Sequence, residues 1–130
     1  NEEIIHFLNV IKMPYNVNQN SQNLALEALQ NLAQKNNFVV KLNEGKKYLL
    51  KELKQISYIQ KVYPSDANFI VIKIDDANYL YHYLTNQHII VRNRDKAPLM
   101  KGCLRISIGT QKENELLIEQ LKNYKVPSHS

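Results

Sequence analysis

The segment from Gly102 to Thr110 reads GCLRISIGT, and it constrains the fold more than any other part of the chain. Its residues alternate with the period of a β-strand, with Leu104, Ile106 and Ile108 on one face and Cys103, Arg105 and Ser107 on the other. Gly109 permits a turn, and Thr110 with Glu113 forms a Thr-x-x-Glu capping box that opens a helix. The segment predicts a strand with one buried face, an arginine on the opposite face, and a helix directly after it.

Helical periods dominate the first half of the chain. The apolar residues of positions 1 to 12 predict a short helix that Pro14 stops, and they are Ile4, Ile5, Leu8 and Ile11. Tyr15 to Asn20 predicts a connector to a helix that is capped near Asn20 or Ser21 and interrupted by Asn36-Asn37. The apolar stripe of that helix consists of Ala25, Ala28, Leu29 and Leu32. The next helix contains Gly45, which weakens it by about 1 kcal/mol without ending it. Its core-facing residues are Val39, Leu42, Leu49, Leu53 and Ile56.

After residue 57 the pattern becomes extended. SYIQKVYP and the FIVIKI of Phe69 to Ile74 predict two strands, joined by a turn at Ser65 to Asn68. Asp75 predicts the cap of a helix that ends near Asn86 and shares one apolar face among Ala77, Leu80, Tyr81 and Leu84. Ile89 to Val91 predicts a short buried strand, followed by a polar loop that Pro98 breaks. The buried stripe of the last helix consists of Leu117, Leu121 and Tyr124.

The order helix, helix, strand, strand, helix, strand, strand, helix predicts an α+β fold, with a small, largely antiparallel sheet and helices packed on one side. The 130 residues suit one soluble domain, and 44% of them are hydrophobic, enough for a core. A membrane span of about 20 apolar residues is absent, as is the pattern of a signal peptide. Cys103 has no partner for an internal disulfide, which fits a reducing, cytoplasmic compartment. A start at Asn1 rather than Met fits an excised domain, and it fits a processed terminus equally well.

Basic residues give a formal net charge of +5, but their distribution argues against nucleic-acid binding. The lysines are scattered, as in Lys46, Lys47, Lys51 and Lys54, where they fit the solvated face of a helix. All three arginines, in contrast, fall between positions 92 and 105. Because a guanidinium matches carboxylate and phosphate geometry, this window indicates a local anion site.

Self-contained catalytic patterns are missing from the chain. The histidines, which are His6, His82, His88 and His129, show no metal-ligand spacing with each other or with Cys103. Cys103 has no activating base in its sequence neighbourhood and is interpreted as a structural thiol. For Arg105 alone, pairing with a surface carboxylate is the simplest interpretation.

Four segments change that interpretation. GCLRISIGT resembles the C-terminal motif of histidinol-phosphate aminotransferases, a family of fold-type I pyridoxal-phosphate enzymes. MPYNVNQNSQ resembles the stretch that enters the family's small domain, PSDANFIVIKI its central strand, and IIVRNRDKAP the strand and loop before the motif. The resemblance spans almost the entire chain and implies a C-terminal small domain at 15–126, preceded by a connector from a missing large domain at 1–14 and followed by a tail at 127–130.

The resemblance also implies roles for individual residues. Arg105 would grip the anionic end of the substrate, and Arg92 would be a second anion-binding arginine. Arg94 lacks that support, and Asn68 and Tyr15 lie in matching segments without an assigned role. Met13 stands where relatives commonly have proline, which affects only the local turn.

The implied cofactor is pyridoxal phosphate, but the family's Schiff-base lysine and its cofactor-pairing aspartate precede residue 1 in the family order. None of the lysines here is assigned that role, so the chain is predicted to be inactive alone. The full enzyme would be a homodimer that transfers an amino group between L-histidinol phosphate and 2-oxoglutarate, with glutamate as the amino donor in reverse. An aromatic-amino-acid aminotransferase, a threonine-phosphate decarboxylase, and a free-standing α+β binding or regulatory domain remain alternatives.

Overall fold

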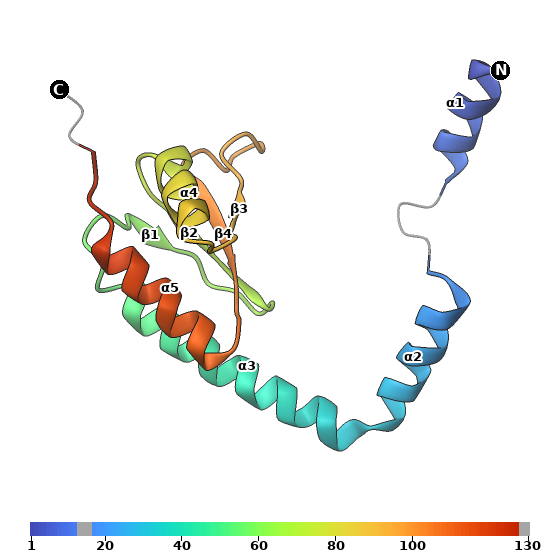
Figure 1. The fold of residues 1–130 in the computed structure, drawn as a ribbon, viewed down its shortest axis with the longest axis horizontal. Helices are drawn as coiled ribbons and strands as arrows, with labels where there is room; N and C mark the ends of the chain where they lie inside the picture. The colour runs from blue at the N-terminus through green and yellow to red at the C-terminus, as the bar shows by residue number, and fades with distance from the viewer. Residues whose placement is uncertain (13–16, 128–130) are drawn as a thin grey trace. The chain divides into compact units, whose positions relative to one another are not determined.

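The computed structural model describes residues 1–12 and 17–127 and divides the chain into two compact units, 1–36 and 37–130. The first unit contains α1 (Glu2–Ile11), α2 (Gln19–Gln30) and the start of α3 (Leu32–Leu53). The second contains the rest of α3 and the remaining elements, which are β1 (Lys61–Val62), β2 (Phe69–Lys73), α4 (Ala77–Asn86), β3 (Arg92–Asn93), β4 (Cys103–Ser107) and α5 (Gln111–Asn123) (Figure 1).

Each helix that begins in the first unit is capped at its N-terminus by an asparagine side chain. The predicted cap of α2 near Asn20 or Ser21 is wrong, because the Asn18 side chain accepts the Ser21 N–H at 2.8 Å. The predicted interruption at Asn36-Asn37 is also wrong, because the break lies at Asn31. The Asn31 side chain accepts the Gln34 N–H at 3.1 Å and so caps the following helix. The predicted stop at Pro14 and the side chain of Tyr15 lie outside the described residues.

Helix α3 continues through Gly45, as predicted, and its second half enters the core of the second unit. Leu49 and Leu53 are fully buried, and Ile56 is buried just beyond the end of the helix. Val39 is 47% exposed, so its predicted place in the core is wrong, and Leu42 is half-buried. The reason is that α5 runs beside the second half of α3 only (Figure 1).

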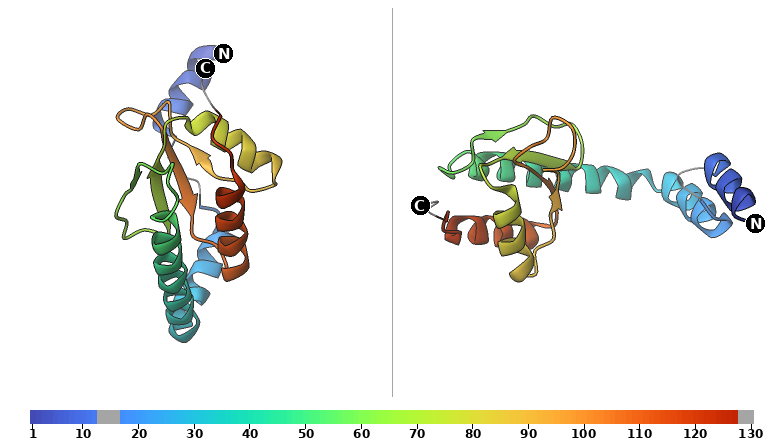
Figure 2. Two further views of the ribbon diagram at one scale, coloured as in Figure 1. Left: turned by 90° about the vertical axis from the view of Figure 1, so that its left-hand side faces the viewer. Right: turned by 90° about the horizontal axis from the view of Figure 1, so that it is seen from above.

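The sheet has strand order β1-β2-β4-β3, and every pair is antiparallel. Helices α4 and α5 lie on the same side of it (Figure 2). The sheet residues in the core are Ile70, Ile72, Leu104 and Ile106, which join one cluster with leucines of α3, α4 and α5. The predicted α+β architecture with helices on one side is therefore confirmed.

Two predicted boundaries around α4 are wrong. Its N-cap is Asp76, whose side chain accepts the Tyr79 N–H at 3.0 Å, whereas Asp75 accepts a hydrogen bond from Gln60. The predicted strand at Ile89 to Val91 is instead the two-residue β3, and Ile90 is 88% exposed. Because the Ile89 N–H donates to the Leu84 carbonyl at 2.9 Å, residue 89 still belongs to the end of the helix.

The predicted final helix is confirmed as α5. Its capping box joins Thr110 and Glu113 in both directions, and Leu117 and Leu121 are buried. Tyr124 is only half-buried, since it is the C-cap residue and packs at the helix end against the rings of Tyr58 and Tyr83.

Candidate functional site

The two arginines that the sequence singles out lie directly opposite each other. In the pairing of β3 with β4, Arg92 is the partner of Arg105. Residues at such positions have Cβ atoms about 4.5–5.5 Å apart and project from the same face of the sheet. Because Leu104 and Ile106 point into the core, this is the face opposite the helices. The fold thus brings together two guanidinium groups that are thirteen positions apart in the chain.

The surroundings of this arginine pair are apolar or cationic. On the other side of Arg105, β2 places Val71 directly opposite, and the Phe69 ring centroid lies 5.1 Å from the Arg105 Cζ. One row further along the same face, Lys61 is the partner of Lys73. In the described part of the chain the one ion pair joins Lys122 to Glu52 at 2.6 Å, so neither arginine has a carboxylate partner there. The open face of the sheet therefore presents positive charge without a neutralising side chain among the described residues.

Arg105 is itself partly enclosed. Its Nε atom is buried and has no hydrogen-bond partner, although the side chain as a whole is only half-buried. Buried donors are normally paired, and an unpaired one costs free energy. A guanidinium held in this way keeps its two terminal nitrogens for an anion, which suits it to bind carboxylate or phosphate.

A hydrogen-bonded loop fixes the two arginine strands relative to each other. The Asp95 carboxylate accepts the Gly102 N–H at 2.8 Å and an Asn78 side-chain N–H at 3.3 Å. The Asn93 amide donates to the Asn78 side-chain oxygen at 2.7 Å. The hydrogen bond from Gly102 holds the pKa of Asp95 below its usual value. The start of β4 and the end of β3 are thereby tied to one carboxylate.

Gly102 is required where it stands. Its φ is +74°, and a Cβ there would lie 2.4 Å from the Ile74 carbonyl oxygen. The Ile74 N–H in turn donates to the Gly102 carbonyl at 2.9 Å. This contact sets the point at which β4 enters the sheet, and with it the face on which Arg105 stands.

The other candidate residues lie around the pair without joining it. The Arg94 backbone N–H donates to the Cys103 carbonyl at 3.0 Å, which extends the β3–β4 ladder. Asn68 is exposed, and its carbonyl accepts the Ile108 N–H at 2.9 Å at the end of the β2–β4 ladder. Cys103 is a buried free thiol. Tyr15 lies outside the described residues.

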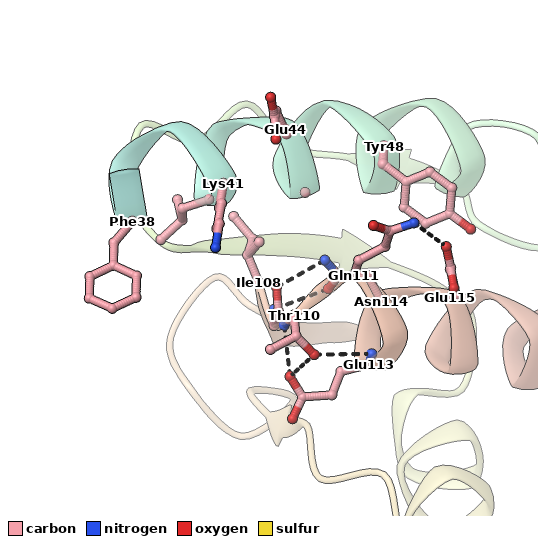
Figure 3. A pocket seen from close by; sticks show the side chains of 13 residues that line it. Phe38, Lys41, Glu44, Tyr48, Ile108, Thr110, Gln111, Glu113, Asn114 and Glu115 are labelled. Carbon is pink, nitrogen blue, oxygen red and sulfur yellow. Dashed lines mark hydrogen bonds between the residues drawn. The ribbon is translucent and has the colours of Figure 1, made fainter. Parts of the chain in front are cut away.

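A separate hollow of the second unit lies between α3 and the start of α5. It measures about 880 Å³, and Figure 3 shows Thr110, Glu113 and Asn114 on one side of it. The Glu113 carboxylate accepts the Thr110 N–H at 2.7 Å and its hydroxyl at 2.8 Å, which lowers the Glu113 pKa. The helix N-terminus already holds a carboxylate of the protein, and none of the lining residues is an arginine. Neither Arg92 nor Arg105 lines this hollow.

Two residues that matter to these geometries escaped the sequence analysis. Asn114 is 2% exposed, and its amide bridges the N–H and the carbonyl of Gly109, both at 3.0 Å. A Cβ on Gly45 would lie 2.8 Å from the Asn114 Nδ2, so this glycine allows α3 to approach the turn. The second residue is Phe69, for which the sequence predicts only a place in a strand. No sequence signal marks its ring, because its place beside Arg105 depends on the register between β2 and β4.

The described lysines do not fit a pyridoxal-phosphate site by themselves. A Schiff-base lysine needs a desolvated or otherwise activated amine. Thirteen of the fourteen lysines are exposed, and the half-buried Lys46 donates to the Ser65 carbonyl at 3.1 Å. Within residues 1–12 and 17–127, no three His, Cys, Asp or Glu side chains are grouped to hold a metal ion. None of the described helices is long and apolar enough to cross a membrane.

Comparisons with known proteins show the family to which the chain belongs. The family model for aminotransferase class I and II matches residues 1–121. Two curated relatives described as histidinol-phosphate aminotransferase, from Flavobacterium psychrophilum and Flavobacterium johnsoniae, are 51% and 44% identical over 121 residues. These alignments cover 92% and 93% of the chain but only 34% and 35% of the relatives. The chain thus spans about a third of the length of the curated relatives it matches.

Solved structures show the same fold at lower identity. The histidinol-phosphate aminotransferase from Clostridium acetobutylicum aligns with a TM-score of 0.75 at 23% identity, over 95% of this chain and 38% of that one. The L-threonine-O-3-phosphate decarboxylase from Porphyromonas gingivalis aligns with a TM-score of 0.70 at 20% identity, over 95% of this chain and 39% of the other.

Proposed function

The chain belongs to the class I and II aminotransferase family, and on that premise we propose that it is the C-terminal domain of a histidinol-phosphate aminotransferase. The enzyme would transfer an amino group between L-histidinol phosphate and 2-oxoglutarate in histidine biosynthesis. The observation that carries the proposal is the pair of arginines, Arg92 and Arg105, opposite each other on the open face of the sheet. Residues 1–14 would connect to a large domain, 15–126 would form the small domain, and 127–130 the tail.

Both substrates of such an enzyme are anionic, which is what this face of the sheet can bind. Arg105 would bind a carboxylate or phosphate bidentately, and Arg92 would neutralise a second charge. The strands hold both side chains on a rigid surface, so the anion fixes the orientation of the reacting amine or ketone. The chain's part in the mechanism is thus to bind the substrate and to orient it.

Aminotransferases of this family generally use pyridoxal phosphate, which acts as an electron sink for the amino-group transfer. The described lysines do not fit its Schiff-base site, so we place that lysine in the remainder of the longer protein. The 130-residue chain alone should therefore not transaminate. Mixing it with pyridoxal phosphate and both substrates should give no turnover, and robust activity would refute the domain assignment.

The substrate is tested with the full-length protein. Histidinol phosphate with 2-oxoglutarate should give kcat/KM well above that of phenylalanine or tyrosine with the same acceptor. A preference for the aromatic amino acids would instead identify an aromatic-amino-acid aminotransferase, and release of carbon dioxide from threonine phosphate a decarboxylase. Sedimentation of the full-length protein would test the proposed homodimer, and cell fractionation the proposed cytoplasmic location.

A further inference from the structure

We infer that Phe69 is a positioning residue for Arg105, whose guanidinium it holds so that an anion is bound through the two terminal nitrogens. The inference rests on the proposed function, because it concerns how the same anion site is built. It adds a residue that does not touch the substrate and that acts through the arginine it contacts.

The register of the sheet places the ring beside the guanidinium. Phe69 is the partner of Ser107, and Val71 is the partner of Arg105, so Phe69 is a diagonal neighbour of the arginine on the open face. The Arg105 Cζ lies 5.1 Å from the ring centroid. A cation within about 6 Å of an aromatic centroid is attracted by the negative face of the ring.

The hydrogen-bonding state of Arg105 shows which side of the guanidinium is closed. Nε is buried without an acceptor. An anion can meet a guanidinium sideways, through Nε and one terminal nitrogen, or end-on, through both terminal nitrogens. Because Nε is covered by protein, the end-on approach is the one that this geometry leaves open.

Repulsion from Arg92 explains why the Arg105 side chain requires a contact that keeps it in place. Like charges directly opposite each other on neighbouring strands destabilise the pairing. Without the ring, Arg105 gains by swinging toward solvent and away from Arg92, which separates the two charges that the substrate must meet together. Attraction to Phe69 on β2 opposes that movement before the anion binds. Binding then costs less free energy, because the Arg105 side chain is already ordered.

The test uses the full-length protein with four single variants. Phe69→Leu keeps an apolar side chain but removes the ring, and Phe69→Tyr restores a ring. Val71→Ala is the matched control, because Val71 lies directly opposite Arg105 without contacting it through a π face. Arg105→Ala reports on the arginine itself. KM and kcat are measured for histidinol phosphate and 2-oxoglutarate, and melting temperatures are recorded alongside.

Phe69→Leu should raise KM roughly 3- to 30-fold with kcat changed less than about 2-fold, the range of a cation–π contact. Phe69→Tyr and Val71→Ala should stay within about 2-fold of the parent. If Phe69→Leu does not fold, Phe69→Met serves as the ring-free variant.

The outcomes separate the inference from the proposed function. A KM raised by Arg105→Ala but not by the ring-free variant overturns the role of Phe69 and leaves the anion site standing. An equal rise with leucine and tyrosine also overturns it, because the ring is then not the acting group. A KM that Arg105→Ala leaves unchanged overturns both.

Discussion

On the helix-covered face of the sheet, Ile70, Ile72, Leu104 and Ile106 are at most 1% exposed, whereas the opposite face carries Arg92 and Arg105 beside a half-buried phenylalanine. The two sets alternate along the same strands, so neighbouring residues of β4 belong to different faces. Burial of the first set stabilises the fold, and the charge of the second is available to a ligand. The difference teaches that substitutions at adjacent residues of β4 should affect different properties. A change on the covered face should lower the free energy of unfolding, and a change on the open face should weaken anion binding.

The largest effect on stability is expected on the covered face. Leu104→Ala should lower the free energy of unfolding by about 2–5 kcal/mol, since Leu104 is fully buried and its truncation leaves a cavity. Val71→Ala, on the open face, should cost about 1 kcal/mol or less, because Val71 is only half-buried. Urea unfolding of both variants measures this contrast. Equal losses in the free energy of unfolding would contradict the proposed difference between the two faces.

Gly102→Ala should come next, with a loss of about 2–4 kcal/mol. Its positive φ of +74° disfavours a side chain, and the new methyl would press on the Ile74 carbonyl. Because this contact fixes the entry of β4, the substitution should damage both faces together, lowering the melting temperature and raising KM in the full-length protein. A variant that melts normally but fails to bind would show that Gly102 serves only the arginine face.

A smaller effect, of opposite sign, is expected at the end of α4. His88 has φ +59°, and its N–H donates to the Thr85 carbonyl at 3.0 Å, which is the left-handed position of a helix end that favours glycine. His88→Gly should therefore raise the free energy of unfolding by about 0.5–1 kcal/mol. Thermal unfolding would show the gain, while an unchanged KM would confirm that the open face is untouched. A lower melting temperature would contradict the assignment.

The smallest expected effect is a pH dependence of stability that arises from Asp95, in the loop between β3 and β4. Because the Gly102 N–H lowers the folded-state pKa of Asp95, its contribution to stability is complete above the unfolded-state pKa of about 3.9 and is lost as the pH falls through the folded-state value. Asp95→Asn should melt below the parent at pH 7, and the gap should shrink toward pH 3. A gap that widens on acidification would mean that the sign of the pKa shift is wrong.

Much of the fold can be predicted from the sequence because local residue preferences and tertiary packing favour the same elements. The alternation of β4 and the capping box of α5 each depend on a few adjacent residues, and both were predicted. The predictions for Val39 and Ile89 are wrong because the apolar character of a residue does not specify which helices or strands pack against it. Asn18 and Asp76 have neighbours with the same propensity to cap a helix. Only the hydrogen bonds in the structure show which of these residues is the cap.

Part of the candidate site can also be predicted from the sequence. The family resemblance predicts Arg92 and Arg105 as anion-binding residues. Their juxtaposition depends on the strand register, which no local pattern specifies. The ring of Phe69 and the amide of Asn114 acquire their roles through contacts across strands or across a turn. Such contacts become visible only in three dimensions.

The most direct test of the account is Arg105→Ala in the full-length protein, with kcat/KM for histidinol phosphate and the free energy of unfolding measured on the same preparation. The account predicts a fall in kcat/KM of roughly 30-fold to several thousand-fold, equivalent to about 2–5 kcal/mol for one lost partner of a charge pair. The free energy of unfolding should change by less than about 0.5 kcal/mol. Equal losses of stability and of transition-state binding, or an unchanged kcat/KM, would contradict it.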